Sequence, residues 1–178
     1  MDKIVEDGLN RIEFLIEESK KEKEDAINKI IENDSELLSR MTELVTPIIP
    51  EVGQVFITKA KQDIKGELYD QKYYSEKMIL LLKSDNPVSL RPDNPKKKVD
   101  NQYCVLSENG QLSELMFSND GFVIDSYLSP ISAEEAISYY GYEIMYILYS
   151  ALSEYCLAQQ DVIDALNITL GMIQKKNE

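Results

Sequence analysis

The sequence predicts an α+β fold: an antiparallel β-meander of about five strands within residues 54–128, packed against long N-terminal and C-terminal helices. Apolar residues recur at helical spacing in residues 1–45 and again in residues 132–173. Between these stretches, two tight-turn sequences separate three short segments rich in β-branched and aromatic residues. Helices that are segregated from a run of strands are typical of the α+β class.

The length of 178 residues fits one domain. We expect a single domain over 1–178, made of an N-terminal helical segment (1–49), an antiparallel sheet (50–130) and C-terminal helices (131–178). The sheet region contains a long loop, 84–101.

The N-terminal segment has an apolar stripe in which Val5, Leu9, Ile12 and Ile16 follow one another at spacings of four, three and four. Seven polar residues at 19–25 interrupt the stripe before it returns. They are either a solvated stretch of one long helix or a turn between two helices. We favour one helix with a kink or restart near Asn33, where good N-cap residues lie. Prolines at 47 and 50 end it.

The central strands are expected at 67–73, 77–83, 102–107, 112–117 and 122–128, while 53–59 is either a strand or a helix end. Asn109-Gly110 is the dipeptide preferred in tight hairpins, and Asn119-Asp-Gly121 forms a second turn signal. The last three strands therefore form an antiparallel meander.

The loop between the two strand groups is long and polar and contains Asp-Asn-Pro twice, at 85–87 and 93–95. Loops of this length within a compact domain are usually functional or disordered. It also holds Lys96-Lys-Lys98, the one cationic cluster of this acidic chain, so we expect it to recognise a partner. The candidate interface residues here are Arg91, Lys96, Lys97 and Lys98.

The C-terminal run starts at Ser132, which with Glu135 has the spacing of a capping box. Gly141 divides the run into a short and a long helix. Residues 142–152 are apolar or aromatic on nearly every side, which is typical of a buried helix. A further restart is expected at 159–161, and the apolar face continues through Leu170 and Ile173.

Tyrosines dominate one side of this helix, because Tyr142, Tyr146 and Tyr149 share a face with Met145 beside them. We expect this face to pack on the sheet of its own domain. The alternatives are a protein–protein surface, since tyrosine is enriched at interfaces, and a small-molecule pocket between helix and sheet. In the pocket interpretation, Asp125 and Tyr127 supply polar contacts.

The composition excludes several classes of partner. The net charge is −13, with 7 basic and 13 acidic side chains in residues 1–50, 10 and 12 in 51–130, and 2 and 7 in 131–178. Binding to nucleic acid or an anionic membrane surface needs a cationic footprint, so neither is expected. No apolar run reaches about 18 residues, and the N-terminus lacks the features of a signal peptide. With Cys104 and Cys156 interpreted as buried thiols, a cytoplasmic location follows.

The sequence also lacks the residues and motifs on which most catalytic sites depend. The chain has no histidine, which removes Ser-His-Asp and Cys-His chemistry and the usual zinc ligand sets. The seven glycines are too far apart for a phosphate-binding loop. No catalytic residues, metal or cofactor are therefore predicted.

The function expected from the sequence is a non-catalytic protein–protein interaction protein: an oligomerising subunit, adaptor or assembly factor of a cytoplasmic complex. Its partner is a second copy in a homodimer, or the other subunits of a larger complex. The first alternative is a small-molecule-binding or enzymatic domain with a pocket between the sheet and the tyrosine-rich helix. The second is an acidic nucleic-acid mimic that binds a basic protein.

Overall fold

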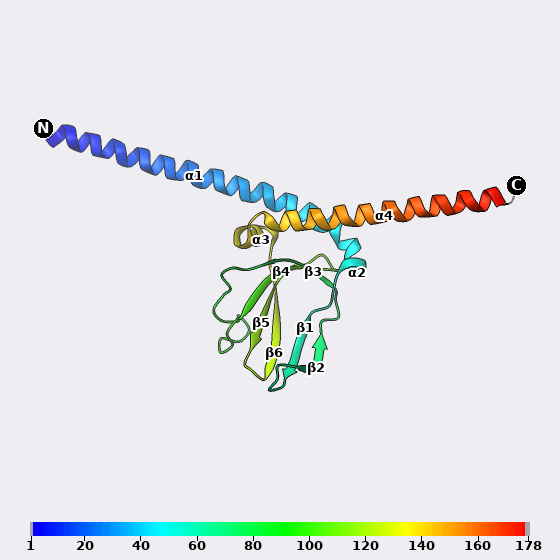
Figure 1. Cartoon of the computed structure of the whole chain (residues 1–178). Helices are drawn as coiled ribbons and strands as arrows, with labels where there is room; N and C mark the ends of the chain where they lie inside the picture. Colours follow the sequence, from blue (N-terminus) through cyan, green and yellow to red (C-terminus); the bar gives the residue numbers. More distant parts are fainter. Residues whose placement is uncertain (1, 177–178) are drawn as a thin grey trace.

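The computed structural model describes residues 2–176 and has the shape of a T (Figure 1). A curled antiparallel sheet forms the stem. Two long helices, α1 (Asp2–Val45) and α4 (Glu143–Lys176), meet above the sheet and leave it in opposite directions. The predicted α+β class and its arrangement of sheet and long terminal helices are confirmed.

The remaining elements connect these parts in chain order. A turn of 3-10 helix, η1 (Thr46–Ile48), and the short α2 (Ile49–Val52) lead from α1 into the sheet, and α3 (Ala133–Tyr140) leads from the sheet into α4. The six strands are β1 (Ile57–Gln62), β2 (Leu68–Tyr73), β3 (Met78–Lys83), β4 (Asn101–Ser107), β5 (Leu112–Asn119) and β6 (Val123–Pro130).

The sheet is curled because its two edge strands are consecutive in the chain. The strand order is β2-β1-β6-β5-β4-β3, so β2 and β3 lie at opposite edges. Tyr73 and Met78 are five residues apart and can be separated by at most about 18 Å. A flat sheet of six strands would be about 24 Å wide. The curl brings the edges together, and Gln54 and Met78 exchange two backbone hydrogen bonds of 3.0 and 2.9 Å across the gap.

The predicted meander of the last three strands is confirmed as β4-β5-β6. Its two turns contain Gly110 and Gly121 at φ +81° and +90°, where a side chain would be strained. The strands expected at 67–73 and 77–83 also form, but they do not pair with each other. Segment 53–59 follows α2: Gly53 is the C-cap of that helix, Gln54 bridges to Met78, and the last three residues start β1.

Both long helices are continuous. The restart expected near Asn33 does not occur, and the polar residues 19–25 are a solvated part of α1. The second expected restart, at 159–161, is also absent from α4. Gly141 does separate α3 from α4, with φ +70°, and Ser132 and Glu135 form the complete capping box at the start of α3.

The main core lies where the helices meet the sheet. Leu38 and Val45 of α1 and Ile144 and Leu148 of α4 are fully buried. They belong to one apolar cluster with side chains of β3, β4, β5, α2 and α3. A second cluster, centred on Met78, Val105 and Leu115, covers the opposite face of the sheet. Only the ends of α1 and α4 that lie nearest the sheet take part in the core.

Leu148 and its neighbour Tyr149 provide a matched test of this core. Leu148→Ala should lower the free energy of unfolding by about 2–5 kcal/mol, because it leaves a cavity among fully buried side chains. Tyr149→Ala should change it much less within an isolated chain, since 65% of Tyr149 is exposed. Urea unfolding at low protein concentration measures both; equal losses would contradict the packing described above.

Candidate functional site

An apolar groove lies between α1 and α4 where the two helices cross. Its volume is about 700 Å³, and Asp34 supplies its one charged lining residue. The other lining side chains are apolar or aromatic: Leu37, Met41 and Leu44 from α1, and Tyr142, Met145, Tyr146, Tyr149 and Leu152 from the start of α4. The structure therefore brings together the four helical residues that the sequence singled out, on one wall of a groove.

The expectation that the tyrosine face packs on the sheet is wrong. Tyr142, Tyr146 and Tyr149 are 59%, 66% and 65% exposed. Ile144 and Leu148 point to the sheet instead, and these residues lie on the other side of the helix. The rings of Tyr142 and Tyr146 pack edge to face on each other, with centroids 6.1 Å apart.

The groove continues along both helices as an apolar seam. On α1, residues at intervals of seven lead from the groove toward the N-terminus, with Lys23 as the polar interruption. We call Leu44, Leu37, Ile30, Ile16 and Leu9 the α1 seam. On α4, residues at alternating spacings of four and three extend from the groove toward the C-terminus. The α4 seam consists of Met145, Tyr149, Leu152, Cys156, Gln159, Ile163, Leu166 and Leu170.

Beyond the crossing, the seams have no intramolecular cover. Every side chain from residue 3 to residue 30 is exposed, as is every one from 156 to 170. Cys156 is among them, which corrects the expectation of a buried thiol at this position; Cys104 is buried as expected. The side chain of Ile173 lies outside the described residues. Leu157, Ile168 and Met172 are exposed on other sides of α4.

The basic loop is anchored to the sheet rather than free. Arg91 is buried and donates from Nε and Nη2 to the two carboxylate oxygens of Asp93, at 2.8 and 2.6 Å. Its Nη1 lies 3.0 Å from Asp125 Oδ2, and its guanidinium carbon lies 5.6 Å from the centre of the Tyr127 ring. Lys97 also pairs with Asp125.

These contacts show where the candidate residues of the loop and of the predicted pocket lie. Arg91 and Lys97 form ion pairs within the chain, and of the four candidate basic residues only Lys96 and Lys98 are exposed. Asp125 and Tyr127 do not form a pocket with the tyrosine-rich face, because they lie under the loop while Tyr146 lies in the groove. Removing the loop would leave the partly buried carboxylate of Asp125 without its partners.

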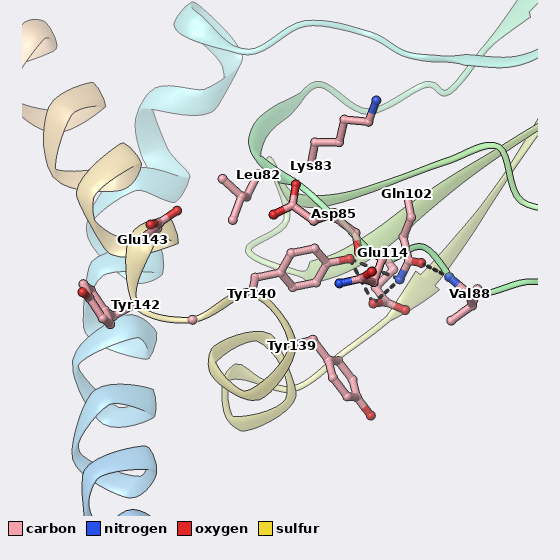
Figure 2. Close-up of a pocket in the computed structure, with 13 residues that line it drawn as sticks. Leu82, Lys83, Asp85, Val88, Gln102, Glu114, Tyr139, Tyr140, Tyr142 and Glu143 are labelled. Atoms are coloured by element: carbon pink, nitrogen blue, oxygen red, sulfur yellow. Dashed lines mark hydrogen bonds between the residues drawn. The ribbon is translucent and has the colours of Figure 1, made fainter.

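A polar pocket that the sequence did not reveal lies between the start of the loop, the sheet and the α3–α4 junction. Figure 2 shows Tyr140 of α3 pointing toward Gln102 of β4 and Glu114 of β5. Tyr140 donates to Glu114 Oε1 at 3.0 Å, and Gln102 Nε2 donates to the same oxygen at 2.6 Å. Val88 N donates to Gln102 Oε1 at 2.8 Å and ties the loop to this network.

Tyr140 in the pocket and Cys104 close to it both keep their protons at neutral pH. Burial, and then the nearby Glu114 carboxylate, raise the pKa of the Tyr140 hydroxyl, which therefore acts as a hydrogen-bond donor. Burial likewise raises the pKa of the Cys104 thiol to about 12, so this cysteine is not a thiolate nucleophile at neutral pH. The pocket has a volume of about 530 Å³.

Comparisons with known proteins gave no match to a family model, a curated protein or a solved structure. Within residues 2–176, no helix is long and apolar enough to cross a membrane. The described residues also contain no group of three or more histidine, cysteine or acidic side chains arranged to hold a metal ion.

The Arg91–Asp93 pair predicts a pH dependence. The hydrogen bonds from Arg91 hold the pKa of Asp93 below its ordinary value, so the pair's contribution to stability is complete above the unfolded-state pKa of about 3.9. It is lost as the pH falls through the lower folded-state pKa. Asp93→Asn should therefore reduce the free energy of unfolding by about 1 kcal/mol at pH 5–7. The difference from the wild type should shrink below pH of about 4.

Urea titrations between pH 3 and 7 test this, with Asp85→Asn as the control. Asp85 is an exposed carboxylate of the same loop that makes no bond to Arg91. A loss for Asp93→Asn that stays constant down to pH 3, or an equal loss for the control, would contradict the assignment.

Proposed function

We propose that this chain is a non-catalytic protein–protein interaction protein, an oligomerising subunit or assembly factor that associates through its two long helices. The observation that carries the proposal is the pair of exposed apolar seams that meet in one groove. Long helices in water depend on packing an apolar face. The described chain offers such packing only near the crossing.

The geometry prevents the seams from covering each other within one chain. α1 and α4 leave the crossing in opposite directions (Figure 1), so their outer halves diverge. A second protein must supply the missing surface. The large seam residues Leu9, Ile16, Ile30, Leu37, Leu44, Tyr149, Ile163, Leu166 and Leu170 are 45–65% exposed.

The free energy available from these side chains is sufficient for a stable complex. Covering half to two-thirds of each contributes roughly 1–2 kcal/mol, or roughly 9–18 kcal/mol for the nine residues of one copy. Association costs about 4–15 kcal/mol in lost translational and rotational freedom. Contributions from both partners exceed this cost. Apolar seams left exposed to water along their whole length would instead favour aggregation.

The groove itself favours binding over catalysis. Its lining has one carboxylate, from Asp34, and no converging set of polar groups around it. Aromatic and methionine side chains are enriched at the centres of protein interfaces. We also propose a cytoplasmic location, which is supported by the free thiol of buried Cys104.

Polar substitution of the outer α4 seam tests the proposal. The triple variant Ile163→Gln, Leu166→Gln and Leu170→Gln should raise the dissociation constant of the complex at least a hundredfold, because each lost apolar contact costs about 1 kcal/mol or more. The matched control is Leu157→Gln, Ile168→Gln and Met172→Gln, which changes residues off the seam that are somewhat more exposed. Light scattering on dilution measures the mass, against 20.4 kDa for one chain.

The control should retain the wild-type assembly. Hydrogen exchange in β4 and β5 should be the same in both variants, which would show that the sheet stays folded. A wild-type chain that is a monodisperse monomer at high micromolar concentration, and that recovers no partner in a pull-down, would overturn the proposal.

A second candidate function is the binding of a small cationic molecule in the polar pocket. The observation that favours it is Glu114, a nearly buried carboxylate in a cavity lined by three tyrosines and by three carboxylates against one cation: Glu114, Asp85, Glu143 and Lys83. A carboxylate among aromatic rings suits an ammonium or guanidinium group. The net charge of −13 also keeps the acidic-mimic alternative open, without a specific site.

A thermal-shift screen with amines, amino acids, nucleosides and metabolites tests this pocket. A true ligand should raise the melting temperature of the wild type, and this shift should disappear in Glu114→Gln, which removes the charge but keeps the side chain's size. Asp70→Asn, which removes an exposed carboxylate on β2, is the control. No shift across the screen, or the same shift in all three proteins, would leave the pocket without a role.

A further inference from the structure

The α4 seam has the repeat of a coiled coil. Its spacings of four and three give an average of 3.5 residues per turn, which is the period at which two helices supercoil around each other. Tyr149, Cys156, Ile163 and Leu170 occupy one core position, conventionally a, and Met145, Leu152, Gln159 and Leu166 occupy the other, d. The spacing is kept from the groove to residue 170, with Gln159 as the one polar amide side chain among these core positions.

We propose that the α4 seam binds the α4 seam of a second copy of this chain, with the two helices parallel and in register. This inference rests on the proposed function and specifies its partner. It is independent of whether the polar pocket binds a ligand.

Charge placement on α4 supports self-association despite the net charge of −13. Between residues 149 and 170 the charged side chains are Glu154, Asp161 and Asp164. In this register they fall at the outward positions f, f and b, which are far from the partner helix. None of them lies next to the seam, so two copies can pair without bringing like charges together.

The positions that flank the core are also suited to a second copy. In a parallel pair, each g residue lies beside the e residue of the next heptad on the partner. Here the g residues are Tyr155, Val162 and Thr169, and the e residues are Ser153, Gln160 and Asn167. All six are uncharged. Such flanks do not select an oppositely charged partner, and they permit an identical one.

The groove favours the parallel arrangement. Met145, Tyr149 and Leu152 belong both to the seam and to the groove wall. A parallel, in-register pair therefore brings the two grooves together, and the exposed Leu37 and Leu44 of α1 are covered as well. An antiparallel pair of α4 helices would place each groove at the far end of the partner helix and leave these α1 residues uncovered.

Cys156 makes the arrangement measurable. In a parallel pair, equivalent a residues face each other across the axis, within the range of about 4–7 Å between Cα atoms that a disulfide spans. Cys104 is buried and does not compete for oxidant. The wild-type chain should therefore form a disulfide-linked dimer on mild oxidation with copper phenanthroline, and Cys156→Ser should not.

Two further variants separate parallel from antiparallel pairing. In the Cys156→Ser background, Ile163→Cys and Leu170→Cys should each cross-link to themselves, because all a positions coincide only when the helices are parallel and in register. Glu154→Cys in the same background is the control, since this exposed residue is on the outer face one turn or less from Cys156. We expect its cross-linked yield to be at least tenfold lower.

The outcomes distinguish this inference from the proposed function. A chain that is dimeric by light scattering but in which Leu170→Cys does not cross-link would overturn the parallel α4 pairing and leave the interaction function standing. A mass of three or more chains would also overturn the two-stranded pairing. A wild-type chain that is monomeric alone but binds a different protein would exclude the second copy as the occupant, and one that binds nothing would overturn both.

Discussion

The rest of the structure depends on the contact of both long helices with the sheet at one place. Leu38, Ile144 and Leu148 are buried there together with side chains of β3 and β4. Since each helix uses one face for this contact, its remaining apolar face is turned away from the sheet. The contact also fixes the directions in which α1 and α4 leave, so that neither helix can cover the other beyond the crossing. The groove, the seams and the expected association all follow from this single packing arrangement.

Charged side chains hold the long loop 84–101 against the sheet. Arg91, which is buried between Asp93 and Asp125 and against the Tyr127 ring, ties the long loop to β6. Removing one partner of such a buried set is costly because an unpaired charge remains. The same loop donates a backbone hydrogen bond to Gln102, which joins it to the Glu114–Tyr140 network. Loop 84–101 has the composition of a mobile loop, but these contacts make it part of the folded structure.

The sequence predicted the elements whose signals are local. The turns at Gly110 and Gly121 require positive φ, and the capping box that begins at Ser132 spans only four residues. Because these signals are local, the sequence predicted them correctly. The packed face of α4 could not be found, because Ile144 and Leu148 on one side and Tyr146 and Tyr149 on the other are all large and apolar. The partners of Arg91, Glu114 and Tyr140 come from distant parts of the chain. No local pattern marks such pairs, and only the folded sheet brings them together.

The pairing of β1 with the distant β6 has a consequence for the order of folding. The hairpins of β4, β5 and β6 form from neighbouring residues, whereas β1 must find β6 after the intervening strands have been made. Pairings between remote segments are slow, because the entropy lost in closing a large loop precedes any gain from contacts. We therefore expect the closure of the curl by Gln54 and Met78 to come late. Until it does, the β3 edge stays open to other chains.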